Sequence, residues 1–147
     1  MADIKSTFRF EDKSKQFINS FKDCGIAFLH EAKDSLASQA QRNTPVETGD
    51  LKRSFGDDSY VDERKLVAYI GSSKRYSVWV ERGTGEYAIN GDGRRGGWIY
   101  KDSDGEWHKT YGMKPKLMLY KAYLEKKKTI AKQAGVHYAR LNKWMSY

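Results

Sequence analysis

The strongest constraint on the fold is a regular apolar pattern that runs through residues 12 to 43. Apolar side chains recur there at steps of three or four, which places them on one face of a helix about seven turns long. They are Phe17, Phe21, Cys24, Phe28, Ala32, Leu36 and Ala40. A helix with one apolar face must cover another layer of the protein, and we expect this one to lie across a sheet.

Directly after this pattern, residues 44 to 54 read TPVETGDLKRS. Pro45 cannot continue the helix, because it lacks an amide proton and disfavours helical geometry in the residue before it. The Thr48 hydroxyl can cap a new short helix, Gly49 relaxes the backbone, and Leu51 can point into the core. The segment therefore predicts a rigid elbow that turns the chain from helix to sheet.

Short strand-like segments fill the middle of the chain, and turn residues join four of them into two predicted hairpins. The segments are 60–61, 66–71, 76–81, 98–101 and 106–109. Residues 83–97 contain six glycines and are too long for an ordinary hairpin loop. Loops of this length are usually functional or disordered.

A second helical pattern covers residues 116 to 134, and Gly135 is expected to end it as a C-cap. Its predicted inward side chains are Leu117, Tyr120, Leu124 and Ile130. The elements predict an α+β fold, with a long N-terminal helix and a C-terminal helix packed on one face of an antiparallel sheet of about five strands. A long Gly-rich loop leaves this sheet.

The length predicts one α+β domain over residues 1–134, with residues 1–11 as an arm or an edge strand. Residues 135–147 form a basic, aromatic C-terminal tail or a short helix. The net charge of +8 arises entirely from residue 114 onward, where nine Lys and Arg face only Glu125. This excess suggests an acidic partner or DNA, and a helix face kept soluble by lysines explains it equally well.

The chain shows no constellation that supports an enzyme or a cofactor. Cys24 lies on the apolar helix face, which predicts a buried and unreactive thiol. A single cysteine also fits a protein that is made and folded in a reducing cytoplasm. The three histidines fall in separate elements without metal-ligand spacing. Residues 91–96 satisfy G-x-G-x-x-G, but a strand follows them where a dinucleotide site needs a helix. No apolar run approaches the roughly 18 residues of a membrane span, so no membrane contact is expected.

Three segments carry a resemblance to a known family. Residues 44–54 look like the T-P-V-x-T-G-x-L-(K/R)-x-S signature of the tail-component or tail-completion proteins of long-tailed bacteriophages. Residues 75–85 are similar to that family's Y-A-x-x-V-E-x-G-T strand. Residues 112–122 resemble its closing M-x-P-x-P-F-L-x-P-A segment, with Lys116 and Lys121 in place of two prolines.

The resemblance implies a non-enzymatic protein of the virion neck, the head–tail interface, made in the host bacterial cytoplasm. Copies are expected to form a ring, six-fold by analogy with other tail rings, around the DNA channel. The implied partners are further copies, the connector, and the tail terminator or tail tube, with non-specific contact to phage DNA. The alternative is a small cytosolic nucleic-acid-binding module that uses the basic C-terminal segment.

Two groups of residues are candidates for these contacts. Strand alternation allows only one face of a sheet to pack under a helix, so some aromatic side chains should reach a neighbouring subunit. The candidates for the oligomer interface are Trp79, Glu81, Arg82, Trp98 and Trp107. The candidates for contact with DNA or another partner are Arg94, Arg95, Lys126, Lys127 and Lys128.

Overall fold

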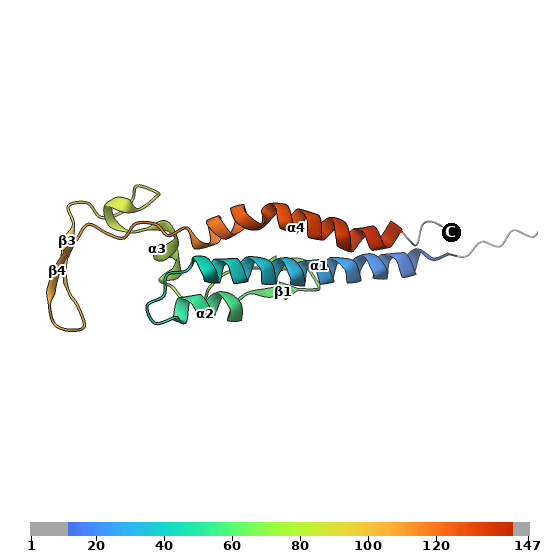
Figure 1. Cartoon of the computed structure of the whole chain (residues 1–147), viewed down its shortest axis with the longest axis horizontal. Coiled ribbons are helices and arrows are strands. Elements are labelled where there is room, and N and C mark those ends of the chain that lie inside the picture. The colour runs from blue at the N-terminus through green and yellow to red at the C-terminus, as the bar shows by residue number, and fades with distance from the viewer. Residues whose placement is uncertain (1–11, 143–147) are drawn as a thin grey trace, which may run out of the picture.

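Two long helices form the body of the protein. The computed structural model describes residues 12–142, in which helix α1 (Ser14–Asn43) and helix α4 (Met118–Asn142) lie side by side and antiparallel (Figure 1). The start of α1 and the end of α4 lie at the same end of the molecule. The pattern from residue 12 to 43 thus correctly predicted the first helix, but its main partner is another helix and not a sheet.

Small residues bring these two helices together. The buried residues of α1 are Gly25, Ala32, Ala37 and Ala40, and those of α4 include Met118, Ala122 and Leu141. Toward the other end of the pair, Tyr138 packs on Phe21 and Phe28, with ring centroids 5.1 and 6.5 Å away. Gly25 makes room for this ring, because a Cβ atom there would lie 3.1 Å from the Tyr138 hydroxyl. Cys24, predicted to be buried, is half-buried.

The elbow leads into a second helix before any strand begins. Thr44 is extended, as expected before a proline, and its hydroxyl donates to the Ala40 carbonyl at 2.6 Å. Gly49 takes a φ of 81°, and the Asp50 amide donates to the Thr48 hydroxyl at 3.3 Å. Helix α2 (Asp50–Asp57) then packs against α1.

The central core forms where α1, α2 and α4 meet. It consists of Ala40, Leu51, Phe55, Met118 and Ala122, with Val80 and Leu119 packed at its edge. Leu51 points into this core, as predicted from the elbow sequence. Phe55 and Met118 are its largest fully buried side chains.

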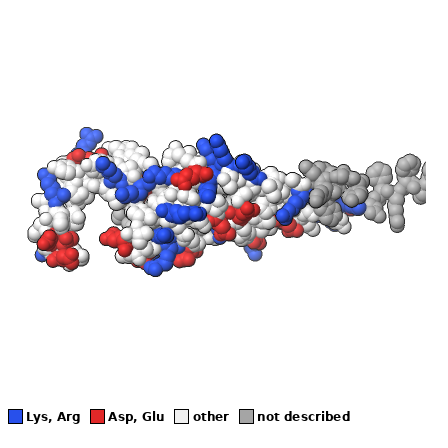
Figure 2. Space-filling view, viewed as in Figure 1, with Lys and Arg blue, Asp and Glu red and all other residues white. Residues whose placement is uncertain are grey.

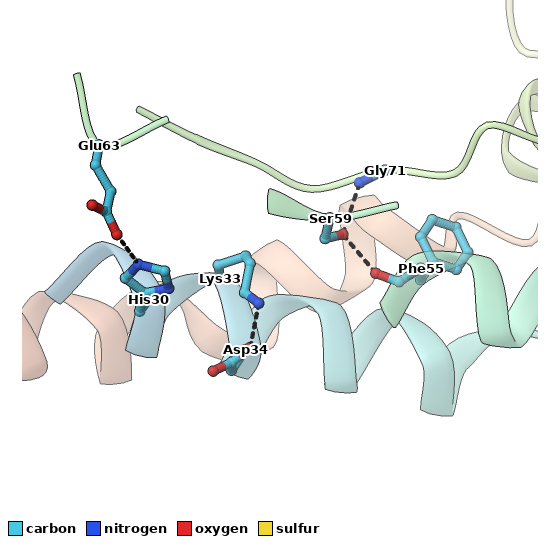
Figure 3. A network of polar contacts seen from close by, with 7 residues as sticks. All are labelled: His30, Lys33, Asp34, Phe55, Ser59, Glu63 and Gly71. Atoms are coloured by element: carbon cyan, nitrogen blue, oxygen red, sulfur yellow. Dashed lines mark hydrogen bonds and ion pairs between the residues drawn. The ribbon is translucent and has the colours of Figure 1, made fainter. Parts of the chain in front are cut away.

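The first predicted hairpin is confirmed. Strand β1 (Tyr60–Asp62) pairs antiparallel with β2 (Val67–Tyr69), and both strands lie against α1. Polar contacts hold this hairpin in place (Figure 3). The Ser59 hydroxyl donates to the Phe55 carbonyl at 2.6 Å and accepts from the Gly71 amide at 3.2 Å. His30 of α1 lies 3.0 Å from the Glu63 carboxylate in the turn.

The rest of the middle segment lies beyond the helix pair (Figure 1). Helix α3 (Ser77–Arg82) is followed by a 3-10 turn, η1 (Gly85–Tyr87), inside the long Gly-rich loop. Strand β3 (Trp98–Lys101) then pairs antiparallel with β4 (Trp107–Thr110) and forms the second predicted hairpin.

The α+β class and the two terminal helices are confirmed, and several finer expectations are wrong. The described residues hold two separate two-stranded sheets, not one sheet of about five strands. Residues 76–81 form a helical turn instead of a strand. Helix α4 continues through Gly135, so this glycine does not end it. The single domain over residues 1–134 stays a prediction, and the arm at residues 1–11 lies outside the described residues.

None of the helices between residues 12 and 142 is both long and apolar enough to cross a membrane.

Candidate interaction surface

The candidate site is the end of the molecule where α3, the Gly-rich loop and the β3–β4 hairpin project beyond the helix pair (Figure 1). We call this part, residues 76–117, the projecting end. It contains all five side chains predicted for the oligomer interface. Its attachment to the helices depends on a small number of hydrogen bonds.

Glu81 joins the projecting end to helix α4. One carboxylate oxygen accepts the Leu119 amide at 3.0 Å and the other accepts the Tyr120 amide at 3.1 Å. These amides belong to the first turn of α4, where backbone donors have no partner within the helix. A carboxylate there also interacts favourably with the helix dipole. Glu81 is therefore a cap supplied from another helix.

The chain returns from the hairpin alongside residues 80–86. The Thr84 amide donates to the Met113 carbonyl, and the Glu86 amide donates to the Tyr111 carbonyl, both at 2.9 Å. The Lys116 amide donates to the Val80 carbonyl, also at 2.9 Å. Together these bonds fix the base of the hairpin on α3 and η1.

Two glycines allow this close approach. Gly85 has a φ of 61°, and a Cβ atom on it would lie 2.2 Å from the Tyr111 carbonyl oxygen. Gly112 has a φ of 119°, and a Cβ atom there would lie 2.0 Å from the Thr84 carbonyl oxygen. Any side chain at either position would push the two segments apart, so the base of the hairpin requires glycine at both.

A hollow of about 330 Å³ lies between α3 and the Gly-rich loop. Trp79, Arg82 and Ile89 line it, together with residues 78, 83–85, 88, 90, 92 and 93. The Ile89 amide donates to the Arg82 carbonyl at 3.0 Å, which folds the loop back over α3. The side chains of Trp79, Arg82 and Ile89 are nevertheless exposed.

The hairpin presents apolar side chains to solvent. Trp107 is 70% exposed and Ile99 is 64% exposed. Trp98 is half-buried, and the guanidinium of Arg94 lies 5.8 Å from the centre of its ring. Arg95 is exposed in the same loop. The structure thus places all five interface candidates at the projecting end, with Glu81 occupied as a helix cap.

The basic candidates divide into two places. Arg94 and Arg95 belong to the projecting end, whereas Lys126, Lys127 and Lys128 lie on α4. Lys126 is half-buried and the other two are exposed. Lys and Arg side chains gather over α4, and acidic side chains mark the hairpin turn at the opposite end of the view (Figure 2).

Acidic side chains stabilise the turns by accepting hydrogen bonds. Asp102 accepts from the Glu106 amide at 2.9 Å and contacts the His108 ring at 2.6 Å, and these bonds lower the pKa of Asp102. The Ser73 amide donates to Asp58 at 2.7 Å and lowers the pKa of that carboxyl group. Asp102 thus stabilises its own turn, whereas Asp58, at the end of α2, binds a residue 15 positions further along the chain.

The helix-cap role of Glu81 could not be found from sequence spacing, because 38 residues separate it from the first amide it binds.

Among residues 12–142, no group of three or more His, Cys, Asp or Glu side chains is arranged to hold a metal ion.

A comparison with protein families gives one match. The model described as "Bacteriophage HK97-gp10, putative tail-component" matches residues 9–83, just over half of the 147-residue chain. The chain therefore belongs to this family of phage tail components, as residues 44–54 and 75–85 indicated. Neither the curated proteins nor the solved structures contain a match. The family supports a structural role in the virion over an enzymatic one.

Proposed function

We propose that this tail component acts in the phage neck, in tail completion and head–tail joining, and that its copies form a ring around the DNA channel. The observation that carries the proposal is the exposed aromatic and aliphatic surface of the projecting end in a member of a tail-component family. Large exposed apolar side chains that gather at one end of a molecule are typical of a protein interface.

A ring requires two different surfaces on each copy that bind each other head to tail. The projecting end and the helix pair are such surfaces, because they differ in fold and in charge. Their partners in the virion would be neighbouring copies within the ring and the connector, tail terminator or tail tube above and below it.

The first test is the mass of the purified full-length protein in solution, measured by light scattering at several concentrations. A six-fold ring has six times the 17.0 kDa mass of the chain. We expect this species to appear, or to grow in as the concentration is raised. A mass that stops at two copies at every concentration would contradict the ring.

The neck position needs a separate test on assembled particles. We expect gold-labelled antibodies against the protein to bind at the junction between head and tail in electron micrographs. Labels confined to the tail tip or spread along the shaft would contradict the neck assignment without contradicting a role in the tail.

The basic face of α4 favours contact with DNA as part of this function or as the alternative one. On α4, Lys127 and Lys128 are exposed, as are Lys121, Lys132 and Arg140, and Arg94 and Arg95 are exposed in the Gly-rich loop. Phosphate contacts would make binding to duplex DNA weaken steeply with salt. We expect K127E/K128E to reduce both the binding and its salt dependence. Equal binding by this variant would exclude a role for the face in holding DNA.

A further inference from the structure

The β3–β4 hairpin lacks the support that a hairpin in water normally needs. Two strands alone are marginally stable unless a further strand or a helix covers one face. Among the described elements, the extensive contacts of β3 and β4 are with each other, and the helices pack elsewhere. One face carries Ile99 and Trp107, the two most exposed of its apolar side chains. This face is therefore suited to pack against another surface.

Helix α4 carries an exposed surface of matching character. Tyr120, Tyr123, Leu124 and Lys127 are spaced so that they share one side of the helix. Tyr120 and Tyr123 are each 54% exposed, and Leu124 is 42% exposed. We call this side of α4, continued to Lys128, the α4 stripe. Two of its members, Tyr120 and Leu124, were expected to point inward, but Met118 and Ala122 occupy the core instead.

The charges of the hairpin turn and of the end of the α4 stripe are complementary, while Lys101 and Lys109 share the face of Ile99 and Trp107. The hairpin turn, residues 102–106, contains Asp102, Asp104 and Glu106 and no basic residue. The α4 stripe ends in the exposed side chains of Lys127 and Lys128. Each surface therefore has an apolar part followed by a charged end, which is acidic on the hairpin and basic on the stripe.

The lengths of the two surfaces are comparable. From Ile99 to Lys101 the strand covers about 7 Å, and the turn at residues 102–106 continues beyond it. From Tyr120 to Lys128 the helix rises about 12 Å. A hairpin laid along α4 with Ile99 and Trp107 over the tyrosines would thus bring its acidic turn to the lysines.

The hairpin cannot make this contact within its own chain as the structure stands, because it projects from the end of the helix pair at which α4 begins (Figure 1). We propose that the β3–β4 hairpin of one copy docks on the α4 stripe of a second copy. The proposal rests on the self-assembly in the proposed function and names the two surfaces that would bind. Because the surfaces differ, every copy can give one hairpin and receive another, as a ring demands.

Charge reversal tests the contact directly. We expect D104K/E106K and K127E/K128E each to raise the dissociation constant of self-association about tenfold or more in 0.1 M salt, because each puts like charges in contact. The variant with all four substitutions restores opposite charges and should recover most of the lost affinity. The matched control, K15E/K22E, reverses two exposed lysines on α1 and should leave association unchanged.

A second variant tests the apolar part. Trp107 is mostly exposed, so W107A should leave the stability of the single chain within about 0.5 kcal/mol. It should nevertheless weaken self-association, because an aromatic anchor at a contact carries much of the binding energy.

Cross-linking detects the contact even when association is weak. In a C24S background, a copy with S103C is mixed at high concentration with a copy that carries K128C, and a short bifunctional maleimide is added. We expect dimers that contain both chains, whereas S103C mixed with K22C, on α1, should give few. No selective cross-link at the highest concentration, or charge reversals without effect on association, would overturn the docking proposal.

These outcomes separate the docking from the ring and the neck. Rings that keep their mass in K127E/K128E and give no S103C–K128C product would leave the proposed function intact and exclude the docking. Selective cross-links in a protein that never exceeds two copies would support the docking and contradict the ring.

Discussion

Glu81 shows how one side chain can serve a purpose that its neighbours in sequence do not reveal. It is one of the candidates for the oligomer interface, and that role stays a prediction. Within the chain, its two carboxylate oxygens accept the amides of Leu119 and Tyr120. The carboxylate thus holds the start of α4 against the end of α3.

Replacing this carboxylate should destabilise the fold. We expect E81A to lower the free energy of unfolding by about 1–2 kcal/mol, because two helix amides lose their acceptor. E81Q keeps one carbonyl oxygen and should lose less. Urea unfolding followed by circular dichroism measures both changes.

The control for this prediction is Glu125, an exposed acidic residue on the same helix. Its replacement, E125A, should change the free energy of unfolding by no more than about 0.5 kcal/mol. If E81A and E125A unfold at the same urea concentration, the hydrogen bonds from Glu81 do not stabilise α4.

At the scale of elements, helix α4 continues through Gly135, and the sign of the change in stability caused by a substitution there tests this. A Cβ atom at Gly135 would have no atom within 4 Å. Because alanine favours the helix interior, G135A should stabilise the protein by about 0.5–1 kcal/mol. If Gly135 instead ended the helix in the left-handed conformation, the same substitution would destabilise it. Thermal unfolding separates the two cases.

Gly25 is the matched control for this substitution, because it lies in a helix interior but faces a neighbour. A Cβ atom at Gly25 would lie 3.1 Å from the Tyr138 hydroxyl, so the ring must move slightly. G25A should therefore gain less stability than G135A. Removing the hydroxyl in G25A/Y138F should recover part of the difference.

The turn of the second hairpin should respond to acid. Hydrogen bonds from the Glu106 amide and the His108 ring lower the pKa of Asp102. Because the folded value is depressed, the turn is stabilised above the ordinary aspartate pKa, and this stabilisation is lost as the pH falls through the folded value. We expect the amide signals of Gly105 and Glu106 to shift in this acidic range in NMR spectra.

The control for the acid response is D102N, which keeps a side-chain oxygen as acceptor but cannot titrate. Its turn should form at neutral pH and show no such shift as the pH falls. An unchanged spectrum of the unmodified protein across the same range would show that Asp102 does not hold the turn.

Sequence reasoning identified the elements that local chemistry determines. Both hairpins follow from their turn residues, and the long first helix follows from its apolar period. The strand predicted over residues 76–81 is wrong, because a six-residue run satisfies strand alternation and helical spacing equally. Packing of Val80 at the core selects the helix. The prediction of a five-stranded sheet is wrong because strand pairing can join residues far apart in the sequence, which local patterns do not reveal. Each hairpin closes on itself, and small residues let α4 take the place beside α1 where a sheet was expected.

For the candidate site, sequence reasoning found the residue types but not their arrangement. Trp79, Arg82, Trp98 and Trp107 all lie at the projecting end, although a helix carries the first two and a hairpin carries the other two. The hollow that Trp79 shares with Arg82 depends on the loop folding over α3, which no local pattern predicts. The α4 stripe was missed because Tyr120 and Leu124 occupy the positions that a helical period alone assigns to the core.

At the scale of the whole molecule, residues 135–142 belong to the helix pair. Removing residues 135–147 would delete Tyr138, which packs on Phe21 and Phe28, and the buried Leu141. It would also delete His137, whose ring lies 2.6 Å from the Glu31 carboxylate. The first half of α1 would then lose much of the surface that covers it.

We therefore expect the truncated chain to lose stability and to expose the start of α1. Loss of a fully buried aromatic side chain costs about 3–5 kcal/mol, and the half-buried Tyr138 should contribute part of this. Hydrogen exchange should become faster at residues 17–28, while the core around Phe55, at the other end of α1, should keep more of its protection. Equal protection of both regions in the truncated and full-length chains would show that this segment is a dispensable tail.

The same reasoning decides how a role in DNA binding must be tested. A truncated chain that fails to bind DNA could fail because α1 has unfolded, so the loss would say nothing about its charges. K127E/K128E reverses two exposed charges and leaves every buried contact of α4 in place. Loss of binding in that variant, with both the state of association and hydrogen exchange at residues 17–28 unchanged, would assign the DNA contact to Lys127 and Lys128 themselves.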